Sequence, residues 1–373
     1  MFGEIRTETT AECAPGILTV DLGALADNYR LLQKQVGPVR VAGVVKANAY
    51  GLGAARIASA LYAAGCRDFF VAQLTEVQSI RAAVGGGSNI YVLNGLQPGA
   101  ETACSNLNAI PVLNSLEQIE RWTSLAGAGN SKLPAVLQFD TGMSRLGLSP
   151  TEIDILLSEP ARLKGIRTLF AMSHLASADE PTCAQNAEQL AAMCHITNSF
   201  PELDISFANT GGIFLGKDYH GAVVRPGIAL YGCQTIESLK LPIAPVVRLD
   251  VRVIQTRKLS AGARVGYGGS YTLSSEKNVA TLAAGYADGL LRSLSNRGAA
   301  YFGNVRLPIL GRVSMDSLTV DISGLEAGVL SLGSLVEIIG EHQTLDQLAI
   351  DAATIPYEIL TSLGCRYHRV YAD

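Results

Sequence analysis

The chain has 373 residues, 48% of them hydrophobic and 17% charged, and it carries a formal net charge of −4. This length suits one large domain with a smaller one, and the slightly acidic balance gives no reason to expect nucleic acid or an anionic membrane as a partner. The first ten residues lack the apolar core of a signal peptide, and no run of 18 apolar residues predicts a membrane span.

The seven cysteines are scattered along the chain, and none of them forms a Cys-x-x-Cys pair. An odd number without regular spacing argues against a disulfide framework or a zinc site and favours a reducing compartment. We therefore expect thiols that behave as small hydrophobic side chains, no metal centre, and a cytoplasmic location.

Short β-branched runs alternate with longer amphipathic stretches from about Ala42 to Gly232. Eight strands are predicted, at residues 39–46, 68–72, 89–94, 109–114, 135–140, 167–174, 204–210 and 222–227. Between them, stretches such as 53–65 and 187–200 have apolar residues near helical spacing. This alternation predicts an α/β fold, a (β/α)8 barrel. A doubly wound sheet is the alternative, but no Gly-x-Gly-x-x-Gly turn follows the first strand.

Two flanking regions do not belong to this repeat. Residues 19–37 predict a short strand and a helix that caps the start of the barrel. Residues 244–259 alternate apolar and polar side chains, as a strand with one wet face does, and Gly-rich turns and further strands follow. We expect residues 1–244 to form the barrel and residues 245–373 to form a second, mostly β domain.

Polar residues follow several of the predicted strands at the end where barrel enzymes place their chemistry. They are Lys46, Asn94, Asp140, Arg145, His174, Asn209, Thr210 and Arg225. A single polar residue at a strand end is usually a solvated rim position, and Asp140 can be only a turn cap, but a whole set on one face indicates a site. The excess of cations over the lone acid predicts an anionic ligand, a phosphate or carboxylate.

Lys46 ends a strand whose pattern points inward, which is an unusual place for an ammonium group. Burial and like-charged neighbours disfavour the charged form, so we expect a lowered pKa for Lys46. A neutral lysine amine attacks carbonyls and forms Schiff bases. The pattern therefore predicts an aldehyde cofactor on Lys46, and pyridoxal 5'-phosphate fits, with its phosphate on backbone N–H groups and hydroxyls.

Nine motifs follow one another through nearly the whole chain: VVKANAYG, FDTGMSRLG, MSHLASADE, FANTGG, VRPGIALYG, VGYGGSY, GYADG, GRVSMD and CRYHRVY. In this order they resemble the alanine racemases, barrel-fold pyridoxal phosphate enzymes that interconvert L- and D-alanine. VKAN alone is weak, because barrel-fold amino-acid decarboxylases carry a similar motif. The resemblance implies a cytoplasmic isomerase that supplies D-alanine for the cell wall or consumes it.

The resemblance also assigns residues to the cofactor. Lys46 matches the lysine that holds the aldehyde carbon. The residues that match the phosphate-binding group are Tyr50, Asn209, Thr210, Gly227 and Ile228. Arg225 matches the arginine that faces the pyridine nitrogen, and His174 matches a histidine between that arginine and a catalytic tyrosine. Arg145 matches the arginine near the phenolic oxygen of the cofactor and the substrate carboxylate.

Racemisation removes a proton on one face of the α-carbon and returns it on the other, so two acid/base groups are needed. The resemblance implies Lys46 for one face and Tyr267 for the other, with Tyr267 reaching the site of the partner subunit in a homodimer. Taken alone, Tyr267 would be interpreted as an aromatic in a Gly-rich turn. Further residues of the second domain match positions that line the site from across the dimer, with Met315 at the substrate and the rest at its entrance: Met315, Tyr271, Tyr286 and Asp316.

The chain departs from the family pattern at three positions, and one of them bears on specificity. Gln138 stands where many relatives have a lysine that becomes carbamylated and steadies the arginine numbered Arg145 here, and Ser314 replaces a cysteine. Cys365 aligns with a tyrosine that contacts the phosphate, and its loss would enlarge the pocket. The main interpretation is an alanine racemase. The alternatives are a racemase for serine or basic amino acids, a barrel-fold decarboxylase, and a non-catalytic pyridoxal phosphate-binding barrel protein, which would stop after the barrel.

Overall fold

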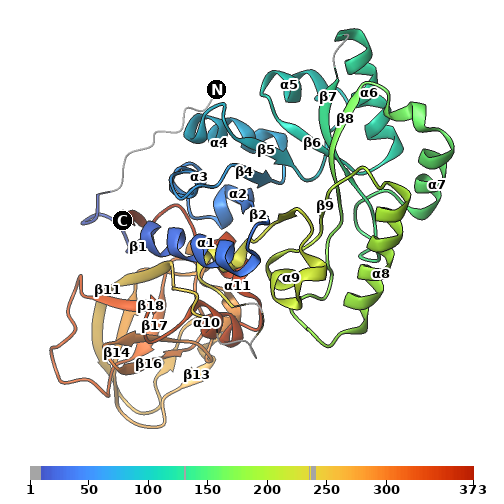
Figure 1. The fold of residues 1–373 in the computed structure, drawn as a ribbon. Helices are drawn as coiled ribbons and strands as arrows, with labels where there is room; N and C mark the ends of the chain where they lie inside the picture. The colour runs from blue at the N-terminus through green and yellow to red at the C-terminus, as the bar shows by residue number, and fades with distance from the viewer. Residues whose placement is uncertain (1–9, 130–131, 235, 237–240) are drawn as a thin grey trace. The chain divides into compact units, whose positions relative to one another are not determined.

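The computed structural model describes residues 10–129, 132–234, 236 and 241–373. These residues form two compact units (Figure 1). One unit is Leu25–Ala244, and the other combines the residues up to Ala24 with Pro245–Asp373. Each unit is therefore described by itself.

The unit Leu25–Ala244 is built on parallel strands. They are β2 (Arg40–Val41), β3 (Gly43–Val44), β4 (Asp68–Val71), β5 (Asn89–Val92), β6 (Ile110–Leu113), β7 (Leu133–Gln138), β8 (Ile166–Met172), β9 (Ile205–Ser206) and β10 (Val223–Val224). Strands β3 to β9 are hydrogen-bonded in chain order, and β10 pairs in parallel with β2. The Ala42 amide donates to the Val224 carbonyl at 2.9 Å, and the Arg225 amide donates to the Ala208 carbonyl at 2.9 Å. These bonds join the two edges of the sheet, so the expected (β/α)8 barrel is confirmed.

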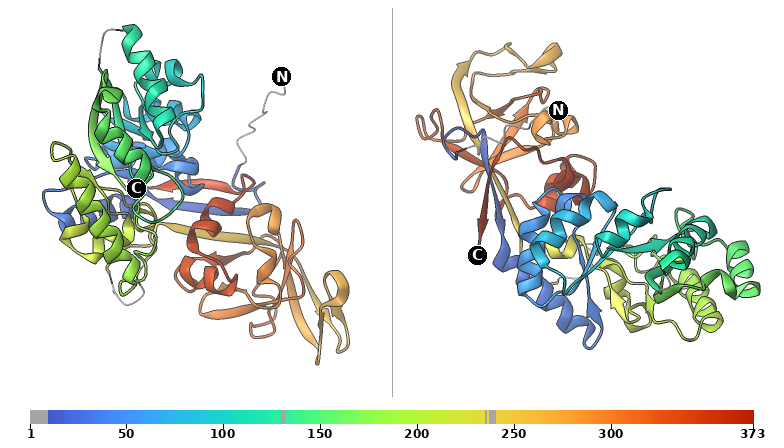
Figure 2. Two further views of the ribbon diagram at one scale, coloured as in Figure 1. Left: turned by 90° about the vertical axis from the view of Figure 1, so that its right-hand side faces the viewer. Right: turned by 90° about the horizontal axis from the view of Figure 1, so that it is seen from above.

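Helices cover the outside of these strands (Figures 1 and 2). They are α1 (Leu22–Val36), α3 (Ala54–Ala63), α4 (Val77–Val84), α5 (Glu101–Asn106), α6 (Leu116–Gly129), α7 (Pro150–Ser158), α8 (Ala184–Ser199) and α9 (Thr210–Leu215). Because helices pack on one side and the barrel interior fills the other, the strand residues are apolar on both faces; Phe69, Phe70 and Val71 are each 0% exposed. Among the described residues, no helix is long and apolar enough to cross a membrane.

The second unit is mostly β-structure. Its main sheet has the order β14 (Lys277–Leu282), β17 (Leu318–Asp321), β16 (Val305–Leu310), β15 (Ala299–Phe302), β18 (Leu335–Ile339), β11 (Val247–Leu259), β1 (Gly16–Asp21), β19 (His368–Ala372). Strand β11 also pairs with β14, so six of these strands close into a ring. A short hairpin, β12 (Arg264–Val265) with β13 (Tyr271–Thr272), and the helices α10 (Leu345–Asp351) and α11 (Pro356–Ser362) complete the unit.

Strand β1 is part of this second sheet, whereas the sequence pattern grouped it with the barrel. Ile17 pairs with Asp250 of β11 in the antiparallel direction and with His368 of β19 in the parallel direction. Leu18 and Val20 are 0% exposed and alternate with half-buried residues, which fits a strand that has one face in a core. The first strand of the chain thus belongs with its last.

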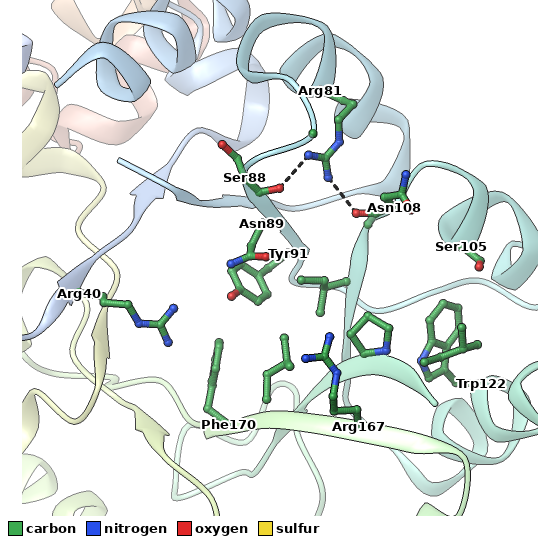
Figure 3. Close-up of a pocket in the computed structure, with 16 residues that line it drawn as sticks. Arg40, Arg81, Ser88, Asn89, Tyr91, Ser105, Asn108, Trp122, Arg167 and Phe170 are labelled. Atoms are coloured by element: carbon green, nitrogen blue, oxygen red, sulfur yellow. Dashed lines mark hydrogen bonds between the residues drawn. The ribbon is translucent and has the colours of Figure 1, made fainter. Parts of the chain in front are cut away.

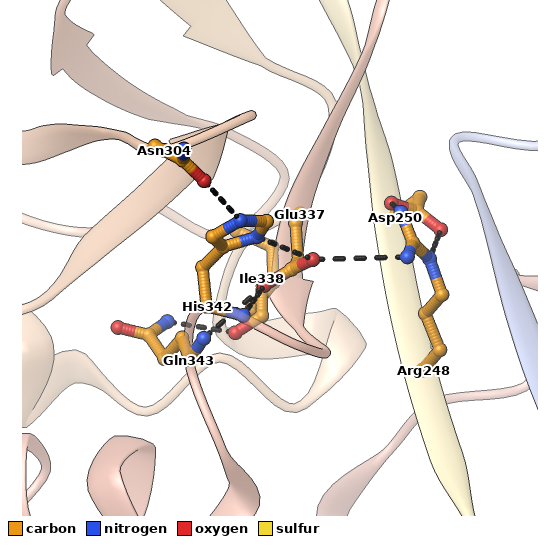
Figure 4. Close-up of polar contacts among 7 residues, drawn as sticks. All are labelled: Arg248, Asp250, Asn304, Glu337, Ile338, His342 and Gln343. Carbon is orange, nitrogen blue, oxygen red and sulfur yellow. Dashed lines mark hydrogen bonds and ion pairs between the residues drawn. The ribbon is translucent and has the colours of Figure 1, made fainter.

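A buried carboxylate organises one turn of this unit (Figure 4). The Glu337 side chain is 5% exposed and accepts the amides of His342 at 2.7 Å and Gln343 at 3.1 Å. The His342 ring lies between Glu337, 3.4 Å from Nδ1, and the Asn304 amide oxygen, 2.8 Å from Nε2. Arg248 approaches the same carboxylate at 3.7 Å. These polar groups satisfy one another, so we interpret the cluster as a structural support for the turn after β18.

Candidate active site

Lys46 lies two residues after the end of β3, at the carboxyl end of the barrel. The preceding residue, Val45, donates its amide to the Phe70 carbonyl at 2.9 Å, so hydrogen bonding to β4 continues up to the residue before the lysine. Burial lowers the pKa of Lys46, and the positive charges of Arg145 and Arg225 add to this effect against the opposing charge of Glu76. The expected lowering is confirmed, and the amine is held toward its nucleophilic form.

The four residues after Lys46 form a left-handed helical turn. Ala47, Asn48, Ala49 and Tyr50 have φ angles of 52°, 55°, 52° and 55°. For residues other than glycine this conformation costs about 1–2 kcal/mol each. The turn is therefore strained, and other contacts must hold it.

Two side chains anchor this turn. Glu76, which follows β4, accepts the Ala47 amide at 2.5 Å and also the amides of Ala72 and Gln73. The Asn48 side chain accepts the Ala54 amide at 2.9 Å. Sequence reasoning missed both the turn and Glu76, because alanine has no preference for this conformation and Glu76 is 29 residues from Ala47 in the chain.

The turn directs Tyr50 toward the predicted phosphate-binding residues. Tyr50 is 5% exposed, and a Cβ built on Gly227 would lie only 2.3 Å from its hydroxyl oxygen, so glycine is required there. The Gly227 amide donates to the Thr210 hydroxyl at 3.0 Å. Asn209 caps α9 by accepting the Gly212 amide at 3.0 Å.

The N-termini of two helical segments therefore lie beside the Tyr50 hydroxyl. One is the N-terminus of α9 at Thr210, and the other is that of the 3-10 turn Ile228–Tyr231. The group contains hydroxyls and backbone N–H groups at helical N-termini and no carboxylate. This donor set fits a phosphate dianion.

Arg225 is a buried cation, and none of the described residues pairs a carboxylate with it. It is 4% exposed and donates to the Ser206 hydroxyl at 2.5 Å and to the Ser173 carbonyl at 2.7 Å. Its Nη2 also lies 3.4 Å from His174 Nδ1. Burial lowers the pKa of Arg225 to about 9, so the guanidinium stays charged at neutral pH with only neutral acceptors around it.

His174 follows β8 and is electrically neutral. Burial, with the positive charges of Arg225, Arg145 and Lys46, lowers the pKa of His174 to about 3. Because a guanidinium can only donate, the Nδ1 that faces Arg225 is the acceptor, and the ring proton is on Nε2. His174 therefore presents an N–H donor on its other side.

The loop after β7 carries Arg145. Asp140 begins this loop and accepts the amides of Gly142, Met143 and Ser144 at 2.9, 3.0 and 3.1 Å, so its alternative role as a turn cap is confirmed. Gln138 is 6% exposed and donates to the Leu146 carbonyl at 3.3 Å. Arg145 itself is exposed and has no carboxylate partner among the described residues.

The site residues predicted in the second unit gather around three adjoining turns. The Tyr286 and Ala287 amides donate to the carbonyls of Ser314 and Met315, both at 3.0 Å. The Tyr267 turn packs on Arg312, whose guanidinium would lie 2.9 Å from a Cβ built on Gly268. Three side chains on these turns are exposed, with fractions of 72%, 44% and 53%: Tyr267, Tyr286 and Met315.

Sequence reasoning missed an ion-pair cluster beside these turns. Arg366 donates to Asp288 at 2.5 and 2.6 Å and to Asp316 at 2.7 Å, and Asp288 is 0% exposed. The cluster holds Asp316 in place. Tyr271 lies in β13 opposite Val265, and Cys365, the aligned departure, is exposed.

A concavity lies at the opposite, amino end of the barrel strands (Figure 3). It has a volume of about 650 Å³. Arg40 there is paired with Asp68 at 3.1 Å, and Arg81 donates to the carbonyls of Gly85, Ser88 and Asn108 at 2.7–2.8 Å. These two cations hold the ends of strands and turns together.

Within the described part of the chain, no three His, Cys, Asp or Glu side chains lie close enough to hold a metal ion.

Comparison with known protein families identifies two matches in this chain. The family model of the alanine racemase N-terminal domain matches residues 20–235, and that of the C-terminal domain matches residues 246–371. The chain is 56% identical over 371 residues to a catabolic alanine racemase of Rhizobium johnstonii, covering 100% of this chain and 98% of that protein. It is 55% identical over 371 residues to an alanine racemase of Brucella canis, covering 96% and 94%. The structure is similar to that of an alanine racemase from Bartonella henselae with covalently bound pyridoxal phosphate, with a TM-score of 0.93 and 44% identity over 96% of this chain and 99% of that one.

Proposed function

The chain belongs to the alanine racemase family, and on that premise we propose which of its residues carry out each part of the reaction. It is a pyridoxal phosphate-dependent enzyme that interconverts L- and D-alanine. Close relatives over the whole length are alanine racemases, which favours this function over a same-fold racemase for serine or basic amino acids. When bound, pyridoxal phosphate supplies an electron-withdrawing ring that acidifies the α-hydrogen of the attached amino acid.

We propose that Lys46 holds the aldehyde carbon of the cofactor and that the donors around Tyr50, Thr210 and Gly227 hold its phosphate. The lowered pKa of Lys46 supports the first assignment, and the acid-free set of hydroxyls and helical N-termini supports the second. Asn209 contributes by fixing the start of α9.

Arg225 is assigned to the ring nitrogen of the cofactor. A carboxylate at that place would share a proton with the nitrogen and keep it charged, whereas a guanidinium only donates. Its four neutral partners hold Arg225 rigidly, which supports this role. We infer that the chain limits the electron demand of the ring and so suppresses side reactions such as transamination.

We propose Lys46 and Tyr267 as the two acid/base groups, with Tyr267 supplied by a second copy of the chain in a homodimer. The exposed fraction of Tyr267 and its position beside exposed Tyr286 and Met315 suit a surface that serves another subunit. A free tyrosine has a pKa of about 10, so it needs a donor that stabilises its anion. The Nε2–H of neutral His174 is assigned this role, and Arg145, with Met315 of the partner subunit, is assigned to the substrate carboxylate.

The observation that carries this function is the buried lysine at the carboxyl end of the barrel beside Arg145 and Arg225, which have no carboxylate partner among the described residues. The seven free thiols suit a reducing compartment, and we place the enzyme in the cytoplasm. A panel of L-amino acids, analysed by chiral separation, should show racemisation of alanine well above that of serine or lysine. Equal rates for the larger substrates would favour the broad-specificity alternative and a pocket enlarged at Cys365.

The two-base assignment predicts unequal effects on the two enantiomers. Tyr267→Phe should abolish α-proton exchange with deuterated water from L-alanine far more than from D-alanine, because only one face loses its base. Mixing Tyr267→Phe with Lys46→Ala subunits should restore part of the racemisation, since a mixed dimer has one site with both bases. Equal loss for both enantiomers would contradict the face assignment, and confirmed heterodimers without activity would contradict the shared site.

A further inference from the structure

Gln189 of helix α8 lies beneath two of the site loops, and no motif pointed to it. It is 0% exposed. Its Nε2 donates to the Thr141 hydroxyl at 3.1 Å and to the His174 carbonyl at 2.9 Å, while its Oε1 accepts the Ala176 amide at 2.9 Å. One side chain thus joins the loop after β7 to the loop after β8.

Gln185, one helical turn earlier, makes a second bridge between the same loops. Its Nε2 donates to the Gly142 carbonyl at 2.9 Å, and its Oε1 accepts from the Ser177 hydroxyl at 2.6 Å. Residues four apart lie on the same face of a helix, so both glutamines point toward the loops. We call Gln185 and Gln189 the glutamine bracket.

The bracket joins the two loops that carry Arg145 and His174. It is also connected to Arg225: Thr141 shares a hydrogen bond of 2.7 Å with the Ser173 hydroxyl, and the Ser173 carbonyl accepts from Arg225 at 2.7 Å. These bonds form one continuous network that joins helix α8 to the Arg225 side chain and to the two loops that carry Arg145 and His174. Buried networks of this kind fix geometry as well as contributing stability.

A leucine or methionine at position 189 would satisfy the packing of the helix without any desolvated amide. The amide of Gln189 is therefore useful because its hydrogen bonds fix the distance between the loop after β7 and the loop after β8. We propose that Gln189 is a positioning residue for racemisation, and that with Gln185 it sets the separation of the Arg145 loop and the His174 loop. This inference rests on the proposed roles of Arg145 and His174.

The test compares Gln189→Met with Asn186→Leu in the holoenzyme. Asn186 is a matched control on the same helix: it is 2% exposed, and its Nδ2 donates to the carbonyls of Ser177 and Glu180, both in one loop. Both variants should lower the thermal midpoint. Only Gln189→Met should lower kcat/KM for alanine, on the order of tenfold to a hundredfold, because small misplacements of site groups are costly.

Hydrogen exchange supplies a readout independent of activity. Gln189→Met should speed exchange in peptides from both loops, residues 140–148 and 173–180, whereas Asn186→Leu should affect only the second. Gln185→Met should act in the same direction as Gln189→Met but more weakly, because Gln185 is only half-buried. The double variant should lose more than the product of the two single losses, since each single variant keeps one bridge.

The proposal is overturned if Gln189→Met loses stability like the control but keeps kcat/KM within about twofold, because the residue would then serve the fold alone. If Gln189→Met does not fold, the same measurements on Gln185→Met and Gln189→Glu test the proposal. Gln189→Glu keeps an oxygen that accepts the Ala176 amide but loses the N–H that donates to the His174 carbonyl. If the unaltered protein fails to racemise alanine, the proposed function fails, but the exchange data on the two loops still report on the bracket.

Discussion

The two ends of the same barrel strands treat positive charge in opposite ways. At the amino end, Arg40 is paired with Asp68, and Arg81 is taken up by three carbonyls. At the carboxyl end, the partners of Arg225 among the described residues are all neutral, and Lys46 has a lowered pKa. The cations at the amino end hold strands together, and we propose that those at the carboxyl end are available for the anionic cofactor. This division agrees with a general rule for barrel enzymes: residues at the amino end of the strands stabilise the fold, and residues at the carboxyl end carry out the chemistry.

The backbone conformation also differs between the two ends, in the number of consecutive residues that have positive φ angles. Two of the turns that lead into strands at the amino end each have one residue at positive φ, Gly65 and Asn108, with φ angles of 104° and 49°. At the carboxyl end, the turn after Lys46 has four consecutive non-glycine residues in that region. Strain is therefore concentrated where the lysine must be placed.

The largest expected effect tests the charge at the carboxyl end. Arg225→Glu should lower the racemisation rate on the order of 10²–10³-fold, as the loss of a preorganised charge does in other sites. It should also raise the pyruvate formed per racemisation event, because a carboxylate would let the ring nitrogen hold a proton. Racemisation and pyruvate are measured in the same reaction. Slower racemisation with an unchanged pyruvate ratio would leave Arg225 as a positioning residue only.

The matching change at the amino end should affect stability and leave the chemistry unchanged. Asp68 is 4% exposed and accepts hydrogen bonds from Arg40, Asn89 and Tyr91, so Asp68→Asn should cost about 2–4 kcal/mol of stability. The single tryptophan, Trp122, is in the barrel unit, and its fluorescence reports urea unfolding of that unit.

The surface pair Asp27–Arg30 provides the control. Its side chains are 72% and 60% exposed, so Asp27→Asn should change stability by less than about 0.5 kcal/mol. We expect kcat/KM to stay within about twofold in Asp68→Asn. A stable Asp68 variant with poor catalysis would reverse the proposed division between the two ends.

The smallest expected effect tests the strain in the turn after Lys46. An alanine-to-glycine change should stabilise the protein in this turn but destabilise it in an ordinary helix. Ala47→Gly should stabilise the barrel by about 0.5–1 kcal/mol, because relief of the left-handed conformation outweighs the added freedom of the unfolded chain. Ala82→Gly, at an exposed position of helix α4, should instead cost about 1 kcal/mol. Urea unfolding followed by Trp122 fluorescence measures both. Destabilisation by both changes would show that the turn carries no strain at Ala47.

The sequence predicted the barrel well because its signals are local. Apolar β-branched runs identified the strands, and the polar residues after them placed Lys46, His174 and Arg225 at one end. The left-handed turn was not predictable, since Ala47 and Ala49 favour other conformations and the side chains of Glu76 and Asn48 that anchor it give no local sequence signal. Gln189 was missed for a related reason. A buried glutamine in a helix looks like any other core position until the loops that it contacts are known.

The pairing of β1 between β11 and β19 has a consequence for synthesis on the ribosome. The residues of the barrel unit, Leu25–Ala244, emerge before the second unit is half made, so the barrel can fold while translation continues. Residues 16–21 emerge even earlier but have no partners until 247–259 and then 368–372 have been made. The oldest strand of the nascent chain is therefore among the last to find its place. A stop codon a few residues early would leave one edge of β1 unpaired even though the barrel is complete.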